Sequence, residues 1–369
     1  SLSWISKHIK FNSDITIDNI SDSLTSLGLE VESVTDSSKG LESFIIAKII
    51  EITQHPNADR LNICKIKTGQ GEYSVVCGAS NVKKNLKAVF APIGATIPSS
   101  GLILKKKDIR GYTGEGMLCS SEELGFETKS NGIIELSDDA PVGKKYSDWL
   151  GLSDPIFEVG LTPNRGDCAS VLGIARELAV IGLGTLINKN VKNIKGTYKS
   201  PIKWEINLNH ENKQACSYVK GRHFRGVKNV ESPEWLKKSL VSIGLKPISS
   251  LVDITNFITF DLGRPLHVFD ASKIKGNLNI RMANQEEKLL ALDAKNYDLT
   301  KSILVISDEN KPVSIAGVMG GEESSCTKNT TEIFIESAYF APQNVATSGR
   351  SLNILSDARY RFERGIDPN

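Results

Sequence analysis

The sequence lacks the features of membrane and secreted proteins. No apolar run approaches the roughly 18 residues of a transmembrane helix, and the longest candidates, such as residues 44–50, are interrupted by Lys48. The first residues, Ser-Leu-Ser-Trp-Ile-Ser-Lys, have no charged start followed by an apolar core, so they do not form a secretory signal. We therefore expect a cytoplasmic protein. Because the chain does not begin with Met, we expect it to start inside a longer natural N-terminus.

Cysteine is scarce and shows no ligand spacing. The chain has 6 Cys, and no two of them form a CxxC pair, so we expect neither a structural zinc site nor any other metal site. Thin and unpatterned cysteine usage is typical of a reducing compartment. We expect buried thiols with no chemical role, at Cys64, Cys77, Cys119, Cys168, Cys216 and Cys326.

A nucleotide-binding loop is also missing. The glycine-rich segment Gly317–Gly321 has no Lys-Ser/Thr pair after it, so it does not match the loop that cradles ATP phosphates. We therefore expect no cofactor in this chain.

The composition itself is that of a globular protein with two or three domains. The chain has 369 residues, of which 40% are hydrophobic and 24% charged, and its net charge is +2. The charge is unevenly placed, because one segment holds seven basic residues and a single acid, Asp108. Two interpretations stay open: a solvated strand edge that resists aggregation, or a surface that faces phosphates. The basic residues are Lys83, Lys84, Lys87, Lys105, Lys106, Lys107 and Arg110.

Residues 41–150 have the texture of a small β domain. Short β-branched or apolar runs alternate there with turn-forming residues, which favours an all-β barrel or sandwich. The expected strands cover residues 44–52, 62–67, 73–77 and 88–91.

Helical patterns flank this β domain. Ile17, Ile20, Leu24 and Leu27 recur at helical spacing before Gly28, a suitable C-terminal cap. Residues 161–187 are expected to return to helix, with Asp167 as the N-cap, an apolar face of Val171, Ile174, Leu178 and Ile181, and Gly182 at the end. We therefore expect the β domain to be inserted into a small α/β framework domain formed by residues 1–40 and 151–195.

Residues 200–369 mix helices and strands, so we expect an α+β domain. Ser232-Pro233 is a typical helix start and Gly244 a typical end. Further helices are expected over 249–260 and 356–363, and strands over 303–307, 313–316 and 333–337. The predicted fold class is thus α+β and multidomain.

Three segments of the β domain resemble the tRNA-binding OB-fold of several aminoacyl-tRNA synthetases and their accessory proteins. They are His55-Pro-Asn-Ala-Asp-Arg-Leu61, Val76-Cys-Gly-Ala-Ser-Asn81 and Gly111-Tyr-Thr-Gly-Glu-Gly-Met-Leu-Cys-Ser120, in that order. Such a barrel offers a strand face and flanking loops to nucleic acid. The resemblance favours the phosphate-facing interpretation of the basic segment.

The rest of the chain narrows the family. Leu2-Ser-Trp-Ile, Leu27-Gly-Leu-Glu-Val31 and Leu161-Thr-Pro-Asn-Arg-Gly-Asp167 flank the β domain. Asp253-Ile-Thr-Asn256, Gly263-Arg-Pro-Leu-His-Val-Phe-Asp270, Ala316-Gly-Val-Met-Gly-Gly321 and Ile335-Glu-Ser-Ala338 follow in order. Together these segments resemble the N-terminal part of the bacterial phenylalanyl-tRNA synthetase β subunit. The resemblance implies an OB-fold followed by an editing domain.

The resemblance also implies an editing pocket. Its catalytic side would hold His267, Glu336, Asn256 and Thr255, and its substrate side Ala316, Gly317 and Ala338. Tyrosine differs from phenylalanine by one hydroxyl, so synthesis errors call for a second site that binds tyrosine and refuses phenylalanine. Glu336 would accept the phenol hydrogen, and His267 would position or deprotonate the attacking water.

Other interpretations of these side chains stay open. A lone His is often structural, a Glu at a strand end is often solvated, and Asn256 equally suits a helix interior where it bonds the backbone. Gly320 and Gly321 equally suit a turn. The alternative function is a non-catalytic scaffold for tRNA binding and assembly.

The resemblance implies a larger enzyme, an α2β2 heterotetramer that makes phenylalanyl-tRNA. Its partners would be tRNA(Phe) and the α subunit, with no membrane and no DNA. ATP and Mg²⁺ would be used at sites outside this chain.

Overall fold

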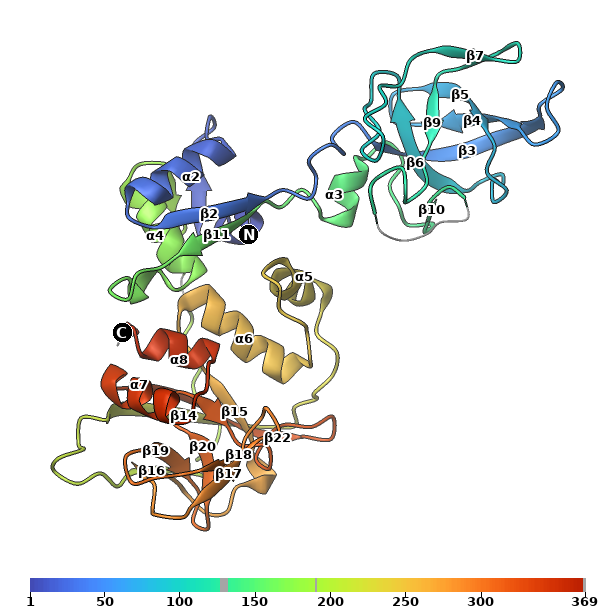
Figure 1. Cartoon of the computed structure of the whole chain (residues 1–369). Coiled ribbons are helices and arrows are strands. Elements are labelled where there is room, and N and C mark those ends of the chain that lie inside the picture. Colours follow the sequence, from blue (N-terminus) through green and yellow to red (C-terminus); the bar gives the residue numbers. More distant parts are fainter. Residues whose placement is uncertain (127–131, 190, 368–369) are drawn as a thin grey trace. The chain divides into compact units, whose positions relative to one another are not determined.

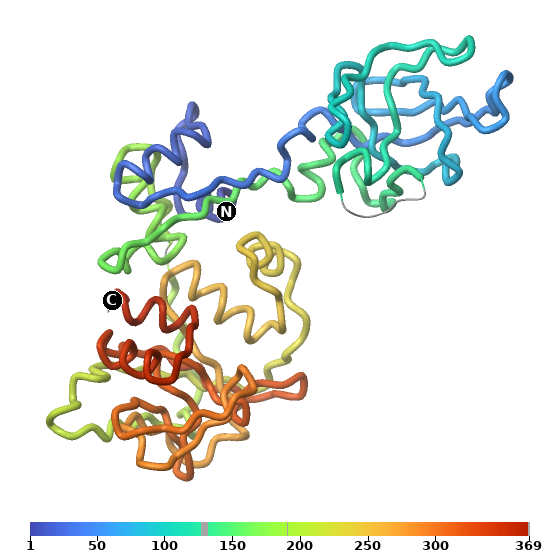
Figure 2. The backbone as a smooth tube through the Cα atoms, viewed as in Figure 1, coloured from blue at the N-terminus to red at the C-terminus, as the bar shows by residue number. Residues whose placement is uncertain are grey.

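The computed structural model describes residues 1–126, 132–189 and 191–367. The chain divides into two compact units (Figure 1). Residues 35–155 form one unit, and residues 1–34 together with those from 156 onward form the other. The chain passes from the unit that contains residues 1–34 into the unit 35–155 through β2 (Glu30–Thr35), and it returns through β11 (Ile156–Gly160). β2 and β11 are hydrogen-bonded neighbours and run side by side (Figure 2).

The unit formed by residues 35–155 is a nearly closed antiparallel barrel. β3 pairs with β4 on one side and β6 on the other, β4 pairs with β5, and β6 also pairs with β9 and β10. Side chains alternate, so that Ala47, Ile49, Cys64 and Ile66 point into a dry core. The remaining elements are a hairpin and one short helix. The bounds are β3 (Ile45–Gln54), β4 (Asn62–Lys67), β5 (Glu72–Cys77), β6 (Lys87–Pro92), β7 (Lys107–Ile109), β8 (Tyr112–Gly114), β9 (Gly116–Leu118), β10 (Glu135–Leu136) and α3 (Tyr146–Leu150).

Glycine is required at one corner of this barrel. Gly116 has φ +144°, and a Cβ there would lie 2.3 Å from the ring of Phe90 and 2.5 Å from the carbonyl oxygen of Ala91. β9 therefore pairs with β6 only because position 116 carries no side chain.

The other unit begins with a small α/β layer. Thr16 and Asn19 form a reciprocal cap at the start of α2, and Gly28 follows its end with φ +78°, as expected. The expected N-cap of α4 was wrong: Ser170, not Asp167, accepts the hydrogen bond from Gly173 N. The elements are α1 (Leu2–Ile5), β1 (Ile9–Phe11), α2 (Ile17–Ser26), η1 (Gly166–Cys168), α4 (Val171–Val180) and β12 (Gly184–Leu186).

Residues from about 200 onward form a five-stranded and a three-stranded sheet with helices packed on them, together with the two-stranded pair of β17 and β18. The larger sheet has the order β13-β16-β19-β20-β21, and the smaller has the order β14-β22-β15. The strands are β13 (Trp204–Ile206), β14 (Cys216–Arg225), β15 (His267–Asp270), β16 (Leu278–Met282), β17 (Lys288–Leu290), β18 (Asn296–Asp298), β19 (Leu304–Ser307), β20 (Pro312–Ile315), β21 (Met319–Gly320) and β22 (Glu332–Phe340). The helices are α5 (Glu234–Ser242), α6 (Ser250–Leu262), η2 (Ala271–Lys273), α7 (Pro342–Ser351) and α8 (Asp357–Phe362).

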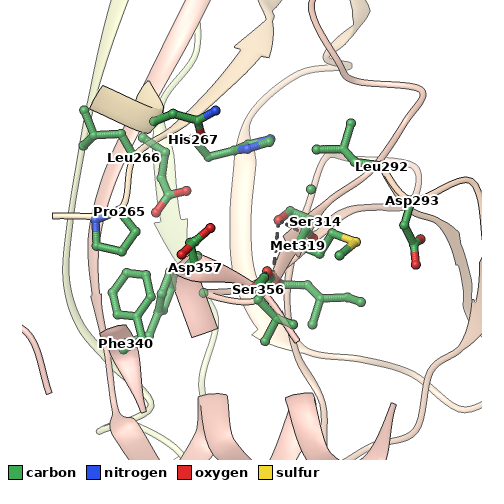
Figure 3. Close-up of a pocket in the computed structure, with 18 residues that line it drawn as sticks. Pro265, Leu266, His267, Leu292, Asp293, Ser314, Met319, Phe340, Ser356 and Asp357 are labelled. Carbon is green, nitrogen blue, oxygen red and sulfur yellow. Dashed lines mark hydrogen bonds between the residues drawn. The ribbon is translucent and has the colours of Figure 1, made fainter. Parts of the chain in front are cut away.

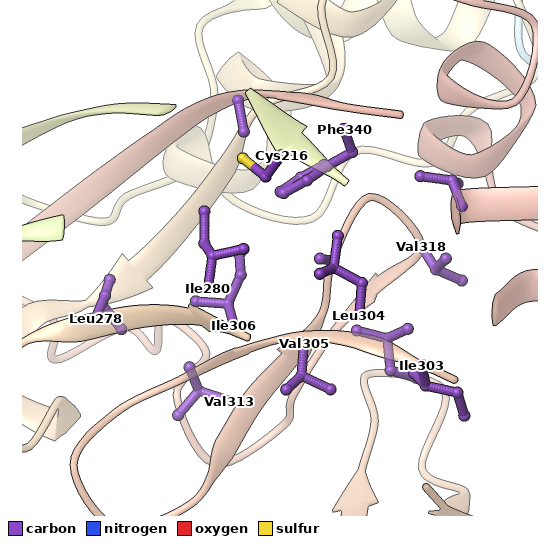
Figure 4. Packing of buried hydrophobic residues seen from close by; sticks show 14 of the residues in the cluster. Cys216, Leu278, Ile280, Ile303, Leu304, Val305, Ile306, Val313, Val318 and Phe340 are labelled. Carbon is purple, nitrogen blue, oxygen red and sulfur yellow. The ribbon is translucent and has the colours of Figure 1, made fainter. Parts of the chain in front are cut away.

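The main hydrophobic core lies between these two sheets (Figure 4). Ile280, Leu304 and Val313 from the larger sheet meet Cys216 and Phe340 from the smaller one. Phe334, Ala338 and Phe340 of β22 point into this core. Side chains alternate along a strand, so Glu336 points to the same face of the sheet as these three residues.

Several polar contacts join the α/β layer to the domain that follows it, including one between His8 and Asp261. Trp4 Nε1 donates to the carboxylate of Asp261 at 2.7 Å, and Arg361 Nε donates to the carbonyl oxygen of Ala169 at 3.0 Å. Within the described ranges, no helix has the length and apolar character needed to cross a bilayer.

Candidate functional site

The site is built on a cross-strand pair. His267 on β15 and Glu336 on β22 are directly opposite each other in the antiparallel register. Such residues point to the same face of a sheet, with Cβ atoms about 5 Å apart. The imidazole and the carboxyl group therefore share one face although they are distant in sequence.

Both side chains line a cavity of about 360 Å³, a size that suits a small-molecule site (Figure 3). Its wall is assembled from α6, β15, the turn after β20, β22, α8 and the loop between β17 and β18. Lining residues include Asn256, Pro265, Leu266, Leu292, Asp293, Ser314, Gly317, Met319, Phe340, Ser356, Asp357 and Phe362.

The carboxyl group of Glu336 is almost fully buried, with 5% of the residue exposed. Burial raises the pKa of Glu336 to about 8, because the charged form loses its hydration and gains nothing in return. At neutral pH the group is therefore mainly a neutral acid, which both donates and accepts a hydrogen bond. A hydroxyl placed beside it satisfies both roles, whereas an aromatic C–H satisfies neither.

The imidazole of His267 is held as a neutral base. Burial lowers the pKa of His267 to about 4, and its Nε2 has no hydrogen-bond partner among the described residues. The ring packs edge-on against Phe269, with 4.4 Å between ring centroids, and lies next to Gly320. A Cβ at position 320 would lie 2.2 Å from His267 Cε1. The His267 ring can occupy this position only because residue 320 has no side chain.

The two α6 residues predicted for the site face different ways. Asn256 lines the cavity, as the prediction required. The hydroxyl of Thr255 instead donates to the carbonyl oxygen of Val252 at 2.7 Å, and the residue is not part of the cavity wall. Successive helix residues point about 100° apart, so one of two neighbours commonly turns away from a given wall.

Of the three small residues predicted for the substrate side, Gly317 lines the cavity, whereas Ala316 and Ala338 do not. Gly317 lines the cavity with φ +69°, and a Cβ there would lie 2.9 Å from Val345 and 3.0 Å from Phe340. Ala316 and Ala338 are fully buried in the main core behind the wall. Their small size therefore acts on the packing behind the cavity.

Several lining residues escaped sequence reasoning. Phe340 lies four positions after Glu336 on the same strand, so period-two alternation would have found it. Leu292, Ser314, Met319 and Asp357 come from loops and elements that only the tertiary fold brings together.

The seven basic residues predicted to contact tRNA fall into two groups. Lys83 pairs with Glu135 at 3.0 Å and Lys106 with Glu115 at 3.4 Å. The Lys87 ammonium donates to the carbonyl oxygens of Asp138 and Ala140, and the Arg110 guanidinium donates to that of Asn57. Across the ranges described by the structure, no polar partner is found for the exposed residues Lys84, Lys105 and Lys107.

One group of possible metal ligands occurs among the described residues, outside this site. Asp167, Cys168 and Glu177 bring ligand atoms within 4.8 Å of one another. The Arg165 guanidinium already lies among them, donating to Asp167 at 3.1 Å and Cys168 at 2.8 Å, with Glu177 at 3.0 Å. This cation accounts for the cluster.

Comparisons with known families agree with the two-part architecture. Residues 44–145 match the family described as a tRNA binding domain, and residues 215–369 match the B3/4 domain family. These ranges contain the barrel and the cavity respectively.

The chain also matches curated relatives along its whole length. It is 48% identical over 370 residues to the phenylalanine–tRNA ligase β subunit of Bradyrhizobium diazoefficiens, and 48% identical over 369 residues to that of Brucella melitensis. In each case the alignment covers 100% of this chain and 45% of the relative, so the chain spans about half the length of these relatives.

A solved N-terminal fragment of the phenylalanyl-tRNA synthetase β subunit from Pyrococcus horikoshii is a distant match. It has 17% identity and a TM-score of 0.29, over 49% of this chain and 55% of that one. The two matched domains and the relatives agree: the chain carries a tRNA-binding domain and a B3/4 domain, and over its whole length it matches the N-terminal portion of phenylalanine–tRNA ligase β subunits.

Proposed function

We propose that this chain binds tRNA(Phe) through its barrel and hydrolyses tyrosyl-tRNA(Phe) in the cavity of the B3/4 domain. The observation that carries the proposal is the cross-strand pair of His267 and Glu336, which face one cavity with Glu336 and the Nε2 atom of His267 buried. Burial of a polar pair without partners is costly, so a fold retains it where a ligand supplies the partner.

Glu336 selects the substrate in this proposal. The phenol of tyrosine exchanges hydrogen bonds with the neutral carboxyl group, while the aromatic ring packs against Phe340. Phenylalanine would leave the carboxyl group unpaired at a cost of about 1–3 kcal/mol, which corresponds to roughly 5- to 150-fold in affinity. The correct product is therefore spared.

The hydrolysis itself needs a placed water. His267 Nε2 is buried and unpartnered, so it is free to hold a water next to the ester carbonyl. Water attacks this carbon, the ester bond breaks, and the ribose oxygen leaves with a proton as a hydroxyl group, releasing tyrosine. Because His267 is neutral at pH 7, it acts as a hydrogen-bond acceptor for the water, and positioning supplies much of the rate.

Asn256 orients the water or the terminal ribose from the facing wall of the cavity. Thr255 acts indirectly, since its hydroxyl fastens the α6 backbone that carries Asn256. Gly317 lets the turn after β20 line the cavity, because a side chain there would collide with Val345 and Phe340.

The chain acts within a larger enzyme in this proposal. The relatives are β subunits, so we propose that the partner is the α subunit of an α2β2 heterotetramer. Synthesis of phenylalanyl-tRNA with ATP and Mg²⁺ is assigned to other parts of that assembly.

The test is deacylation of tyrosyl-tRNA(Phe) by the heterotetramer. We expect His267→Ala and Glu336→Ala each to slow release of tyrosine about 100-fold or more, because each removes a group that contacts the substrate or its water. Glu332→Ala is the control, since this carboxylate lies on the same strand but outside the cavity wall. If neither cavity substitution slows release, the non-catalytic scaffold becomes the better account.

A further inference from the structure

The exposed side of β14 carries a second polar surface, separate from the cavity and from the barrel. Tyr218, Lys220, Arg222 and Phe224 alternate along this strand and point to one face; we call them the β14 stripe. All four are exposed, with 44% of Tyr218 and 37% of Phe224 accessible. β14 is an edge strand of its three-stranded sheet, and one of its backbone carbonyls, that of His223, accepts a hydrogen bond from the Tyr198 hydroxyl at 3.0 Å.

The stripe combines cations with flat rings. The Lys220 ammonium lies 5.2 Å from the ring centroid of Tyr218, and the Arg222 guanidinium carbon lies 5.6 Å from that of Phe224. The residues opposite the stripe on β22 are Tyr339, Ser337, Ile335 and Ile333. None of these four is acidic, so no carboxylate faces the cations across the strand pair. The Arg222 guanidinium donates one hydrogen bond, to the carbonyl oxygen of Ile194 at 2.5 Å, and keeps its positive charge.

Protection of the strand edge explains only half of this pattern. Lysine and arginine on an edge strand do deter pairing with other chains. Exposed tyrosine and phenylalanine do the opposite, because they add apolar area and β propensity to that edge. The rings therefore need another reason.

We propose that the β14 stripe binds single-stranded RNA, with Tyr218 and Phe224 stacking on bases and Lys220 and Arg222 neutralising phosphates. A sheet face that presents aromatic rings between basic residues is a common way to hold unpaired nucleotides. An acidic peptide would satisfy the two cations but would offer no flat faces to the rings. The inference goes beyond the proposed function, since it adds an RNA contact that neither the barrel nor the cavity supplies.

The position of the stripe gives it a use. β22 pairs with β14 and carries Glu336 on its opposite face, so the stripe and the cavity wall belong to the same pair of strands. RNA held on the stripe is thereby held by the element that forms the editing pocket.

The test measures binding of a 5′-fluorescein-labelled 12-nucleotide RNA of mixed sequence by fluorescence anisotropy. The full chain is used with Lys84, Lys105 and Lys107 changed to Met, so that the barrel contributes little. We expect Tyr218→Ala with Phe224→Ala to weaken binding roughly tenfold or more. We expect Lys220→Glu with Arg222→Glu to weaken it similarly and to reduce the salt dependence, the slope of log K against log salt, by about 1.4.

Two controls separate the stripe from general charge and from unfolding. Lys238→Glu with Lys301→Glu reverses two exposed cations elsewhere in the same domain, and should leave binding within about twofold. Tyr218→Trp with Phe224→Trp keeps flat rings and should retain binding even if the alanine variant unfolds.

The proposal fails if the stripe and control variants bind equally well, or if a poly-glutamate peptide competes as well as RNA of equal charge. Photo-crosslinking with a 4-thiouridine oligonucleotide gives an independent answer: adducts within 216–225 support the proposal, and adducts confined to 35–155 overturn it. Complete loss of binding in the barrel variant with an intact stripe also overturns the proposal, because the stripe alone should still hold this RNA. A partial loss there measures the share that the barrel contributes.

Discussion

The cavity and the basic segment of the barrel differ in whether their polar side chains already have partners within the fold. In the cavity, the buried imidazole of His267 lacks a partner for Nε2, and burial alone shifts the pKa of both His267 and Glu336. In the barrel, four of the seven predicted basic residues already have partners. Residue type alone therefore says little about availability. What distinguishes a group that is ready for a ligand is whether the fold has already supplied its partner.

The largest effect is expected from a substitution that displaces the His267 imidazole without removing it. Gly320→Ala places a Cβ where the His267 ring now lies, so the ring must move. We expect tyrosyl-tRNA deacylation to fall about 100-fold, since a misplacement near 1 Å has that effect. The assay uses the heterotetramer. Gly321→Ala is a poor control because its Cβ would meet the Val313 backbone. Gly196→Ala serves as the matched variant, because its φ is not positive and its Cβ would meet only the Tyr198 carbonyl oxygen, at 3.7 Å.

The second prediction concerns the neutral state of Glu336. Its folded pKa, about 8, lies above the ordinary value of 4.5, so the stability it contributes is complete below pH 4.5 and is lost as pH rises to 8. Glu336→Gln does not titrate, so its melting temperature relative to wild type should rise between pH 5 and pH 8, by roughly 4–8 °C. A constant difference between the two proteins across this range would show that Glu336 is charged in the fold.

Lys87, whose ammonium has partners, and Lys84, whose ammonium has none among the described residues, should differ in their effect on stability. Lys87 satisfies two carbonyl oxygens, at 2.5 and 2.7 Å, so Lys87→Met should lower the free energy of unfolding by about 1–2 kcal/mol. Lys84→Met removes an exposed cation without a described partner and should change stability by less than about 0.5 kcal/mol. Urea unfolding measures both, and equal losses would contradict the division into paired and available cations.

The smallest expected effect is on tRNA affinity. Lys105→Met with Lys107→Met removes two available cations, whereas Lys83→Met with Lys106→Met removes two that are already paired. Both variants lose the same net charge. We expect the first to weaken tRNA binding severalfold more and to lower its salt dependence by one to two, measured by filter binding between 50 and 200 mM salt. A larger loss in the second variant would reverse the assignment.

Much of the fold could be predicted, because many elements are encoded locally. Residues 62–67 form β4 as expected, and the helix expected over 249–260 is α6 (Ser250–Leu262). The strands β14 and β15 were not predicted, because Cys216–Arg225 has no apolar alternation and His267–Asp270 is short. Both exist through pairing with β22, a contact between distant segments. α7 also escaped, since its Ser and Gly residues are weak helix formers.

The candidate site follows the same division. Motif order brought His267, Glu336, Asn256 and Gly317 to the right neighbourhood, and all four line the cavity. Periodicity could not tell which neighbour on α6 faces inward, so Thr255 was included with Asn256 although its hydroxyl is turned to its own helix. The shared face of His267 and Glu336 depends on a register that pairs β15 with β22, which no local pattern specifies.

The pairing of β2 with β11 makes the barrel an inserted domain whose two connections to the host unit lie next to each other. The chain departs at Thr35 and comes back at Ile156, on neighbouring strands of the host unit. A short turn between these strands would restore a continuous hairpin without opening the host core, as is usual where insertions are tolerated. Because every residue that lines the B3/4 cavity lies outside 35–155, we expect deletion of the barrel to leave the cavity walls in place.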